Sequence, residues 1–307
     1  MTERKIGVVG IPGRWSTETL ADAVAERTGF RLVVDMREVE LDLATRRLLF
    51  KDWNLCDLDA LIVKKIGETY TPNILDRLEL LKVAQAQGVR VFSRVECILR
   101  LVDRLSCTVA LRNSAIPMPD TRVTESLSVA ARTVREFGGA VLKPLYSTKA
   151  RGMCAIDGRA SDEEIDAAIG EFQRYNPMMY VQRKLDLPGR DLGLVFLGGE
   201  YLGCYARIGH GAAWNTTIHS GGHYAPYSPS AAVIDLAARA QRIFGMDYTT
   251  VDVAETAEDP VVFEVSAFGG FRGAFEGAGI NVARLYARHV VRQLDVSAGN
   301  GLGAARQ

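Results

Sequence analysis

The chain has 307 residues, and 48% of them are hydrophobic, which is enough to fill the cores of two or three packed units. Lys and Arg together number 37, as do Asp and Glu, so the charge balance gives no global field that would favour nucleic acid. Five scattered cysteines without a C-x-x-C pair argue against disulfides and structural zinc. The N-terminus has no apolar segment typical of a signal peptide, and no run of roughly 18 apolar residues could span a membrane. A cytoplasmic protein is therefore expected.

The N-terminal part of the chain, residues 1–93, alternates between strands and helices. Short apolar strands are expected at residues 5–10, 31–35, 60–65 and 89–93. A helix capped near Ser16 should follow the first strand, and another should cover residues 73–88. This alternation predicts an α/β domain built on a parallel sheet.

A second domain is expected over residues 94–185. It begins with a helical stretch over residues 94–115, which ends at IPMPD because its two prolines cannot continue a helix. A small α+β unit follows, with predicted helices at 126–137 and 161–174 and predicted strands at 140–145, 153–157 and 178–185. Residues 146–152 join two of these strands as a hairpin.

A third domain, also α+β, is expected over residues 186–296. Its first two strands, at 191–199 and 200–209, are joined through Gly198-Gly199. The remaining predicted elements are a polar loop at 210–229, a helix at 229–244, strands at 249–255 and 261–267, a glycine-rich turn, and a last helix at about 279–294. The tail SAGNGLGAARQ, residues 297–307, is predicted to be disordered.

The stretch LKPLYSTKARGM, residues 142–153, combines a strand end with a cationic loop. An apolar strand ends at Lys143 and runs into a small, polar loop that carries Lys149 and Arg151. Backbone amides and cations that converge at a strand end suit a phosphate, although the spacing is not that of a Walker loop. Two readings are open from this stretch alone: a solvated hairpin turn with a basic tip, and a phosphate-binding loop.

Two carboxylates stand in successive apolar strands near the C-terminus. Asp252 lies in TVDVA and Glu264 in VFEVS, and the two strands should pair as a hairpin. A buried carboxylate without a partner is costly, so the pair invites a functional explanation. Magnesium takes one or two protein carboxylates and completes its shell with phosphate oxygens and water. The alternative is two edge-strand carboxylates that face water.

With these features in place, the order of motifs resembles the ATP-grasp superfamily and, within it, the RimK-type carboxylate–amine ligases that add amino acids, often glutamate. The resemblance covers about Arg94 to Ala283. It rests on seven motifs in order: LVDRL (101–105), VLKPLYSTKARGM (141–153), YVQRKL (180–185), GRDLGLVFLGG (189–199), YARIGHGAAWNTTIHSGG (205–222), TVDVA (250–254) and VFEVSAFGGFRG (262–273). It implies the ATP-grasp fold, in which two α+β subdomains clasp ATP behind the N-terminal parallel-sheet domain.

The resemblance also implies roles for individual residues. Lys143 would contact the α- and β-phosphates, Arg207 would steady the transferred phosphoryl group, and loop 146–152 would close over the phosphates as a lid. The implied nucleotide-binding residues are Arg104, Lys143, Ser147, Thr148, Arg151, Gly152, Gln182, Arg183, Leu185 and Asp191. The implied metal ligands are Asp252, Glu264 and Ser266, for magnesium or manganese.

The chain departs from the family pattern at four positions. Arg104 stands where many relatives have a second ATP-binding lysine, and Ser220 where an arginine is common. The D-x-R pattern that often follows the adenine-binding strand, here residues 178–185, reads Asp191-Leu192-Gly193. The E-x-N magnesium pair reads Glu264-Val265-Ser266, in which serine offers one neutral oxygen in place of an amide carbonyl.

Candidate substrate residues lie in three segments. Trp214, Asn215 and His219 belong to the loop that faces the acceptor in RimK-type enzymes. Arg14 and Trp15 follow the first strand, at the end where open α/β sheets bind ligands, with a helix cap and a packing aromatic as the alternative. Arg272 would hold a substrate carboxylate. For the loop histidines, His210, His219 and His223, the spacing fits no standard zinc pattern, and a solvated substrate loop is favoured over a metal site.

The function implied is ATP-dependent amide formation through an acyl phosphate, with ADP as product. The expected partners are a small-molecule carboxylate acceptor and an amino-acid amine donor. No nucleic acid or membrane partner is expected, and whether the chain forms a homo-oligomer is left open. Two alternatives remain: an ATP-binding regulatory protein with impaired catalysis, and an ATP-dependent phosphotransferase on the same fold. Related ligases extend tetrahydromethanopterin, methanofuran-like and deazaflavin coenzymes, and by analogy the expected acceptor is a precursor of such a coenzyme or a peptide.

Overall fold

The computed structural model describes residues 4–148, 150–209, 216 and 221–304. Its N-terminal sheet has the order β2-β1-β6-β7, and all neighbouring strands are parallel, so the predicted parallel sheet is confirmed. The strands are β1 (Ile6–Val9), β2 (Leu32–Val34), β6 (Ala60–Val63) and β7 (Arg90–Phe92), with helices α1 (Trp15–Thr28) and α2 (Asn73–Ala86). Strands β1 and β6 are buried along their whole length, as expected for a parallel sheet with helices on both faces.

Two details of this unit differ from the prediction. Helix α1 begins at Trp15, and the amides of Ile11 and Gly13 bond to the side chains of Thr17 (3.3 Å) and Glu18 (2.6 Å) from its first turn. Ser16 lies inside the helix, and the N-cap residue is Arg14, whose side chain makes no capping hydrogen bond. A small antiparallel sheet that the sequence did not predict lies between β2 and β6; it contains β3 (Glu40–Asp42), β4 (Arg47–Phe50) and β5 (Trp53–Asn54).

The helical stretch predicted over residues 94–115 is two helices, α3 (Val95–Val102) and α4 (Arg104–Asn113). Asp103 between them is extended (φ −95°, ψ 117°), and its carboxylate accepts hydrogen bonds from the amide of Leu105 (3.0 Å) and the hydroxyl of Ser106 (2.8 Å). An aspartate in this conformation caps a new helix rather than continuing the old one. The break places Arg104 at the first position of α4.

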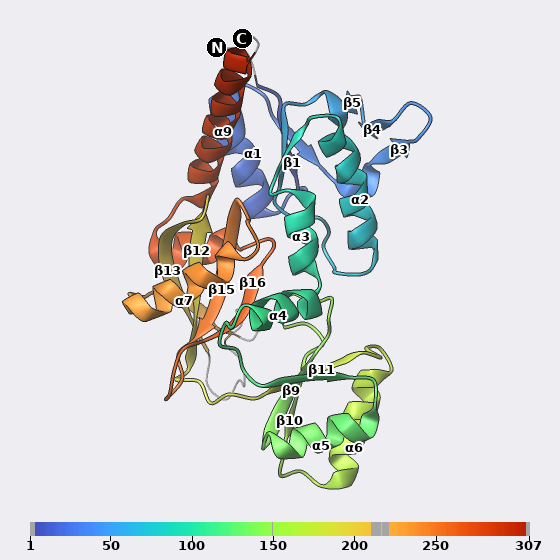
Figure 1. Cartoon of the computed structure of the whole chain (residues 1–307), viewed down its shortest axis with the longest axis vertical. Helices are drawn as coiled ribbons and strands as arrows, with labels where there is room; N and C mark the ends of the chain where they lie inside the picture. Colours follow the sequence, from blue (N-terminus) through green and yellow to red (C-terminus); the bar gives the residue numbers. More distant parts are fainter. Residues whose placement is uncertain (1–3, 149, 210–215, 217–220, 305–307) are drawn as a thin grey trace.

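The central unit forms a separate sheet at the lower end of the molecule in Figure 1. The strand order is β10-β9-β11-β8, with every pair antiparallel, and two helices cover it from one side. The elements are β8 (Thr121–Thr124), α5 (Leu127–Glu136), β9 (Gly139–Lys143), β10 (Cys154–Asp157), α6 (Asp162–Gln173) and β11 (Met179–Arg183). The predicted β9–β10 hairpin is present, and Lys143 is the last residue of its first strand.

The C-terminal sheet has the order β14-β13-β12-β15-β16 and is antiparallel throughout. Its elements are β12 (Arg190–Leu197), β13 (Glu200–Ile208), β14 (His223–Pro226), α7 (Ala231–Arg242), β15 (Tyr248–Ala254), β16 (Val261–Ser266), α8 (Phe271–Ala278) and α9 (Val282–Ala304). Strand β14 lies in the predicted polar loop. Helix α9 runs beyond the predicted end near residue 294, into residues for which the sequence predicted a disordered tail.

Helix α8 replaces the predicted glycine-rich turn. Its glycines face a bulky neighbour: a Cβ at Gly273 would lie 2.5 Å from the ring of Tyr205, and a Cβ at Gly277 would lie 2.6 Å from the Cβ of Tyr205. Glycine is therefore required here for the close approach of the helix to β13, and not for a turn. The helix ends at Gly279, which is left-handed (φ 69°).

The N-terminal and C-terminal units share their packing. One hydrophobic cluster runs from β6 and α2 through α3 and α4 to the C-terminal sheet, while the central unit has a core of its own. Figure 1 shows α9 lying along α1, so the last helix of the chain packs against the N-terminal unit. The domain boundaries at 93/94 and 185/186 stay predictions.

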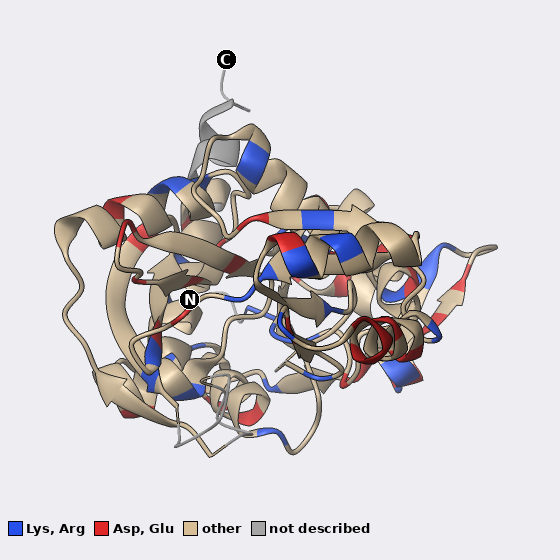
Figure 2. Ribbon diagram, turned by 90° about the horizontal axis from the view of Figure 1, so that it is seen from below, with Lys and Arg blue, Asp and Glu red and all other residues tan. Residues whose placement is uncertain are grey.

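Charged side chains of both signs are spread over the folded chain. Figure 2 shows Lys and Arg interspersed with Asp and Glu along helices and strands, in keeping with 37 residues of each sign. Among the residues described, no helix is both long and apolar enough to cross a membrane.

Candidate active site

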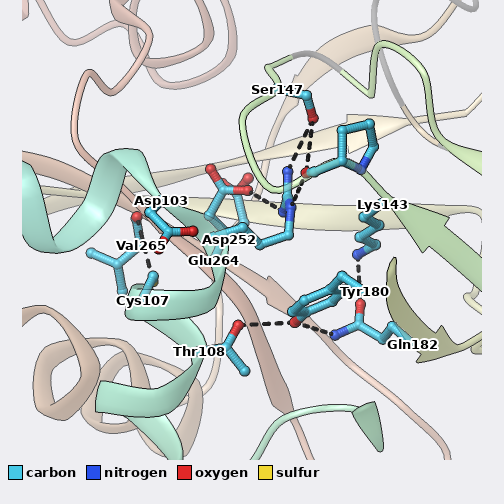
Figure 3. Close-up of polar contacts among 12 residues, drawn as sticks. Asp103, Cys107, Thr108, Lys143, Ser147, Tyr180, Gln182, Asp252, Glu264 and Val265 are labelled. Carbon is cyan, nitrogen blue, oxygen red and sulfur yellow. Dashed lines mark hydrogen bonds and ion pairs between the residues drawn. The ribbon is translucent and has the colours of Figure 1, made fainter. Parts of the chain in front are cut away.

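The paired carboxylates lie on one face of the C-terminal sheet. Asp252 and Glu264 are direct partners across the antiparallel pair β15–β16, and Figure 3 shows their side chains next to each other. Burial raises the pKa of Asp252 to about 6, although the guanidinium of Arg207 opposes the shift. The predicted hairpin and the pairing of the two carboxylates are confirmed.

Arg207 connects this pair to a third carboxylate. Its Nε lies 3.1 Å from both carboxylate oxygens of Asp191, its register partner across β12–β13, and its Nη2 lies 3.0 Å from Oδ2 of Asp252. Thr216 also donates a hydrogen bond to Asp191. Burial disfavours the guanidinium charge, but the two carboxylates hold the pKa of Arg207 well above its ordinary value. A fixed, permanently charged guanidinium thus sits beside Asp252.

Arg104 performs the same pairing for Glu264 and ties the loop after β9 to it. Its Nη1 lies 3.0 Å from Oε2 of Glu264, and its Nε donates to the carbonyl of Pro144 at 3.1 Å. Its Nη2 lies 3.4 Å from the hydroxyl of Ser147, and its amide donates to the carbonyl of Leu145 at 3.1 Å. Arginine can make these contacts at once because its planar fork carries five donors, which a lysine at this position would lack.

Lys143 approaches from the central sheet. Its ammonium donates to Oε1 of Gln182 at 2.5 Å and lies 5.2 Å from the centroid of the Phe263 ring. The amide nitrogen of Gln182 is held by Thr121 (3.1 Å) and Tyr180 (3.2 Å), so its oxygen is directed at the lysine (Figure 3). Burial, and then the nearby charge of Arg104, lower the pKa of Lys143 to about 7. An incoming anion would restore its full charge.

The other predicted nucleotide-binding residues lie in the loop after β9 and at the end of β11. Ser147, Thr148, Arg151 and Gly152 lie in the loop between β9 and β10, where Ala150 and Gly152 are left-handed (φ 56° and 68°) and the carbonyl of Thr148 accepts from the amide of Arg151 at 3.3 Å. Arg183 ends β11 and forms an exposed ion pair with Asp120 at 2.9 Å, and Leu185 lies two residues beyond it. Their contacts to a nucleotide stay predictions.

The predicted substrate residues are only partly brought together. Trp15 packs against Phe275 of α8 (ring centroids 5.8 Å apart), and the guanidinium carbon of Arg272 lies 5.4 Å from the Trp15 centroid. Arg14 pairs instead with Glu68. Trp214, Asn215 and His219 lie outside the described residues, as do Lys149, His210 and Ser220.

The missing arginine of the D-x-R pattern has a steric explanation. A Cβ at Gly193 would lie 2.4 Å from Cζ of Tyr205, its register partner on β13, so no side chain fits there while the tyrosine is in place. Tyr205 is buried and packs edge-on against Tyr224 (5.4 Å) beside Arg207. The sequence alone does not predict that Tyr205 shapes this face, because the clash depends on strand register.

Ser266 lies on the same face as Glu264, because alternate residues of a strand point to the same side. Its register partner is Thr250, and its carbonyl accepts a hydrogen bond from the hydroxyl of Thr249 at 2.7 Å. The serine side chain is therefore placed beside the carboxylate pair, although its role as a ligand stays a prediction.

We expect Ser266→Asn to fold and to lower the magnesium concentration needed for half-maximal ligation, because the amide oxygen adds a ligand of the kind that hard cations prefer. Activity measured across a magnesium titration tests this. Ser266→Ala is the matched control and should shift the midpoint little or upward. A Ser266→Asn protein that does not fold would show that position 266 is packed and that only Asp252 and Glu264 serve the metal.

The residues present fit a magnesium ion. Oδ1 of Asp252 is buried and has no hydrogen-bond partner among the described residues, so one carboxylate oxygen faces the site uncommitted. The described residues contain no group of three or more His, Cys, Asp or Glu side chains that could hold a metal unaided. Two carboxylates with bound phosphates and water form a normal magnesium shell, so the site suits a metal that arrives with a nucleotide.

A buried lysine that the sequence analysis did not single out lies at the end of β6, beside this site. The ammonium of Lys64 donates to the carbonyl of Gly269 at 3.0 Å and lies 4.5 Å from the centroid of the Phe271 ring. The side chain is enclosed, and burial lowers its pKa to about 7, with a smaller contribution from the charge of Lys65. The contact joins residues 205 positions apart, so it could not be predicted from a local sequence pattern.

This burial predicts a pH-dependent stability. The folded state loses the Lys64 proton near pH 7, whereas the unfolded state keeps it to about pH 10.5. Burying the charged ammonium therefore destabilises the fold fully below pH 7, and this destabilisation disappears as the pH rises from 7 to 10.5. The unfolding free energy of wild type should therefore rise, relative to that of Lys64→Met, by up to about 1.4 kcal/mol per pH unit between pH 7 and 10. Urea unfolding at several pH values measures it. Lys82→Met, at a half-exposed lysine on α2, should show a constant difference. A constant difference for Lys64→Met would contradict the prediction.

Comparison with known proteins agrees with this geometry. The model of the RimK-like ATP-grasp domain matches residues 102–290. The chain is 25% identical to a tetrahydromethanopterin:alpha-L-glutamate ligase of Methanosarcina acetivorans, over 91% of this chain and 96% of that protein. It is 24% identical to a ribosomal protein bS6–L-glutamate ligase of Salmonella paratyphi B, over 91% and 93%.

Solved structures give the same fold. A RimK domain protein of Sphaerobacter thermophilus superposes with a TM-score of 0.72 at 24% identity, over 93% of this chain and 98% of that one. The ATP-grasp ligase PsnB, complexed with a variant of its minimal precursor, Mg and ADP, superposes with a TM-score of 0.73 at 16% identity, over 95% and 99%. The predicted ATP-grasp fold is confirmed.

Proposed function

Because this chain belongs to the RimK-like ATP-grasp family and is an ATP-dependent carboxylate–amine ligase, we propose that it adds glutamate, or a similar amino acid, to a small coenzyme precursor of the tetrahydromethanopterin, methanofuran or deazaflavin type, or to a peptide. The observation that carries the chemistry is the carboxylate pair Asp252–Glu264 with a cation against each member. The relatives named as glutamate ligases support the choice of amino acid. The coenzyme acceptor is supported by the tetrahydromethanopterin ligase, and the peptide by the ligase for bS6.

The proposed reaction has two steps. The acceptor carboxylate attacks the γ-phosphorus of ATP, forming an acyl phosphate and releasing ADP. The amine of the amino acid then attacks the acyl carbon, forming the amide and releasing phosphate. Charge accumulates on the transferred phosphoryl oxygens, so stabilisation by fixed cations is the main contribution that a protein can make.

The residues of the site suit this chemistry. Lys143, with a pKa of about 7 in this structure, would become fully charged against the α- and β-phosphates. Arg207, held in place by Asp191, would face the γ-phosphoryl group from beside Asp252. Asp252 and Glu264 would hold magnesium, which neutralises phosphate charge when it is bound. The loop between β9 and β10, anchored to Arg104 through Pro144 and Ser147, would exclude water that hydrolyses an acyl phosphate.

The test is a screen of amino acids against coenzyme precursors and peptides. We expect ADP to form only when both an acid and an amine are present, and mass spectrometry should find a product lighter than the sum of the two substrates by one water. ADP formed with a phosphorylated product and no amide would favour a phosphotransferase. Nucleotide binding without turnover in any pair would favour a regulatory protein and would contradict the proposal.

A further inference from the structure

Two adjacent lysines, Lys64 and Lys65, follow β6 directly, and the mechanism proposed above uses neither. They stand at the carboxyl edge of the N-terminal parallel sheet, which is the edge where open α/β sheets bind ligands. Both contact the segment 267–270, which continues from the strand that carries Glu264 and Ser266. The lysines therefore border the candidate active site from the N-terminal unit.

Lys64 fixes this segment in position. Its ammonium bonds to the carbonyl of Gly269 at 3.0 Å, and Gly269 packs so closely on Thr250 that a Cβ would lie 2.7 Å from the threonine Cγ2. Thr250 and Ser266 are register partners, two residues along from the Asp252–Glu264 pair. At about 3.3 Å per residue, the anchored segment lies about 7 Å along the strands from the carboxylates.

Lys65 is directed to the same side. Its ammonium lies 4.4 Å from the centroid of the Tyr70 ring, 3.4 Å from the Tyr70 hydroxyl and 5.7 Å from the centroid of the Phe268 ring. The two rings pack edge to face, 6.2 Å apart. Burial raises the pKa of Tyr70, and the charge of Glu264 raises it further, so the phenol lies within electrostatic reach of Glu264.

We propose that this corner is a binding site for a substrate carboxylate, in which Lys65 contacts the carboxylate and Lys64 is a positioning residue that holds segment 267–270 as the floor. The proposal rests on the proposed function, because both substrates of a carboxylate–amine ligase of amino acids carry a carboxylate. It adds to that function a named site for one of them, in the N-terminal unit, whereas Lys143 belongs to the central sheet.

The surroundings suit a carboxylate on an aliphatic chain. Tyr70 and Phe268 offer apolar ring surface for methylene groups, and the polar groups beside them are the Lys65 ammonium, which carries three N–H donors, and the Tyr70 hydroxyl. Burial lowers the pKa of Lys64 to about 7, and an anion bound in this corner would favour its charged form. The carboxylate could belong to the amino acid or to the acceptor, and the experiment separates the two.

The experiment compares Lys65→Met and Lys65→Arg with wild type. L-Glutamate is titrated by calorimetry into protein saturated with magnesium and ADP, and KM is measured for each substrate of the pair that the screen identifies. If the site binds the amino acid, Lys65→Met should weaken L-glutamate binding or raise its KM at least tenfold. If it binds the acceptor, the KM of the acceptor should rise by that factor instead. In both cases the KM of ATP should stay within threefold, and Lys65→Arg should recover most of the loss.

Lys64→Met tests the positioning role. Lys82→Met is the control, because it makes the same substitution at a lysine of α2 that pairs with Glu79 at 2.6 Å rather than with segment 267–270. Lys64→Met should raise the KM of the same substrate with kcat within threefold, which a general loss of structure would not do. The lysine site is wrong, and the ligase assignment stands, if wild type forms amide while Lys65→Met has wild-type constants for both substrates or an altered KM for ATP alone. If wild type forms no amide with any pair, the site falls together with the proposed function.

Discussion

Glu264→Gln should lower the rate of amide formation by about three orders of magnitude while nucleotide binding stays measurable. The amide keeps the shape of the side chain but removes the charge that would hold magnesium against the phosphates. It also removes the ion pair with Arg104 (3.0 Å), so the freed guanidinium keeps a cation near the nucleotide. Single-turnover assays across a magnesium titration, with calorimetry for ATP, measure both effects.

Glu255→Gln is the matched control for this substitution. Glu255 follows the same strand as Asp252 and pairs with Arg190 at 3.3 Å, so its replacement also removes a partly buried ion pair, but away from the candidate site. It should cost some stability and leave the rate within a few fold. Equal rates for Glu264→Gln and wild type at every magnesium concentration would contradict the placement of the metal on β16.

Lys143→Ala should weaken ATP binding by about one to two orders of magnitude and leave the fold intact. The ammonium bonds to Gln182 and lies near Arg104, whose charge opposes its own, so the folded protein gains little from it. Calorimetry with ATP and a melting curve test the two parts of the prediction. Lys184→Ala, at an exposed lysine just beyond the same sheet, is the control and should bind ATP as wild type does.

Unchanged ATP affinity in Lys143→Ala would show that the loop after β9 is a solvated hairpin with a basic tip rather than a phosphate site. A large loss of melting temperature would show that the lysine serves the core between the two sheets. Lys143→Met separates these outcomes, because it keeps the aliphatic stem and removes only the charge.

The parts of the fold that follow from local pattern were predictable. Alternating apolar strands and helices predicted the parallel sheet, and two apolar strands that each carry one carboxylate predicted the Asp252–Glu264 pair. Resemblance across seven motifs supplied the fold. The break at Asp103 was missed because a cap inside a helical pattern competes with periodicity, and helix α8 was missed because its glycines serve close packing against Tyr205.

The contacts that arrange the site could not be read from the chain, because they join distant segments. Arg104 and Glu264 are 160 residues apart, and Lys64 and Gly269 are 205 apart. Their meeting depends on how three sheets pack, which no window of sequence records. The steric relation between Gly193 and Tyr205 likewise depends on the register of β12 and β13, and it explains a departure from the family pattern that the sequence alone left without a cause.

The central claim is that the site transfers the γ-phosphoryl group of ATP to a carboxylate before the amide forms. Isotope transfer tests it most directly. With an acceptor whose carboxylate is labelled with oxygen-18, the phosphate released during ligation should carry one labelled oxygen for each amide formed, because the bond from carboxylate oxygen to phosphorus survives when the amine displaces phosphate. Phosphate without label, in a reaction that nevertheless forms amide and consumes ATP, would contradict the acyl phosphate and with it the roles given to Arg207, Asp252 and Glu264.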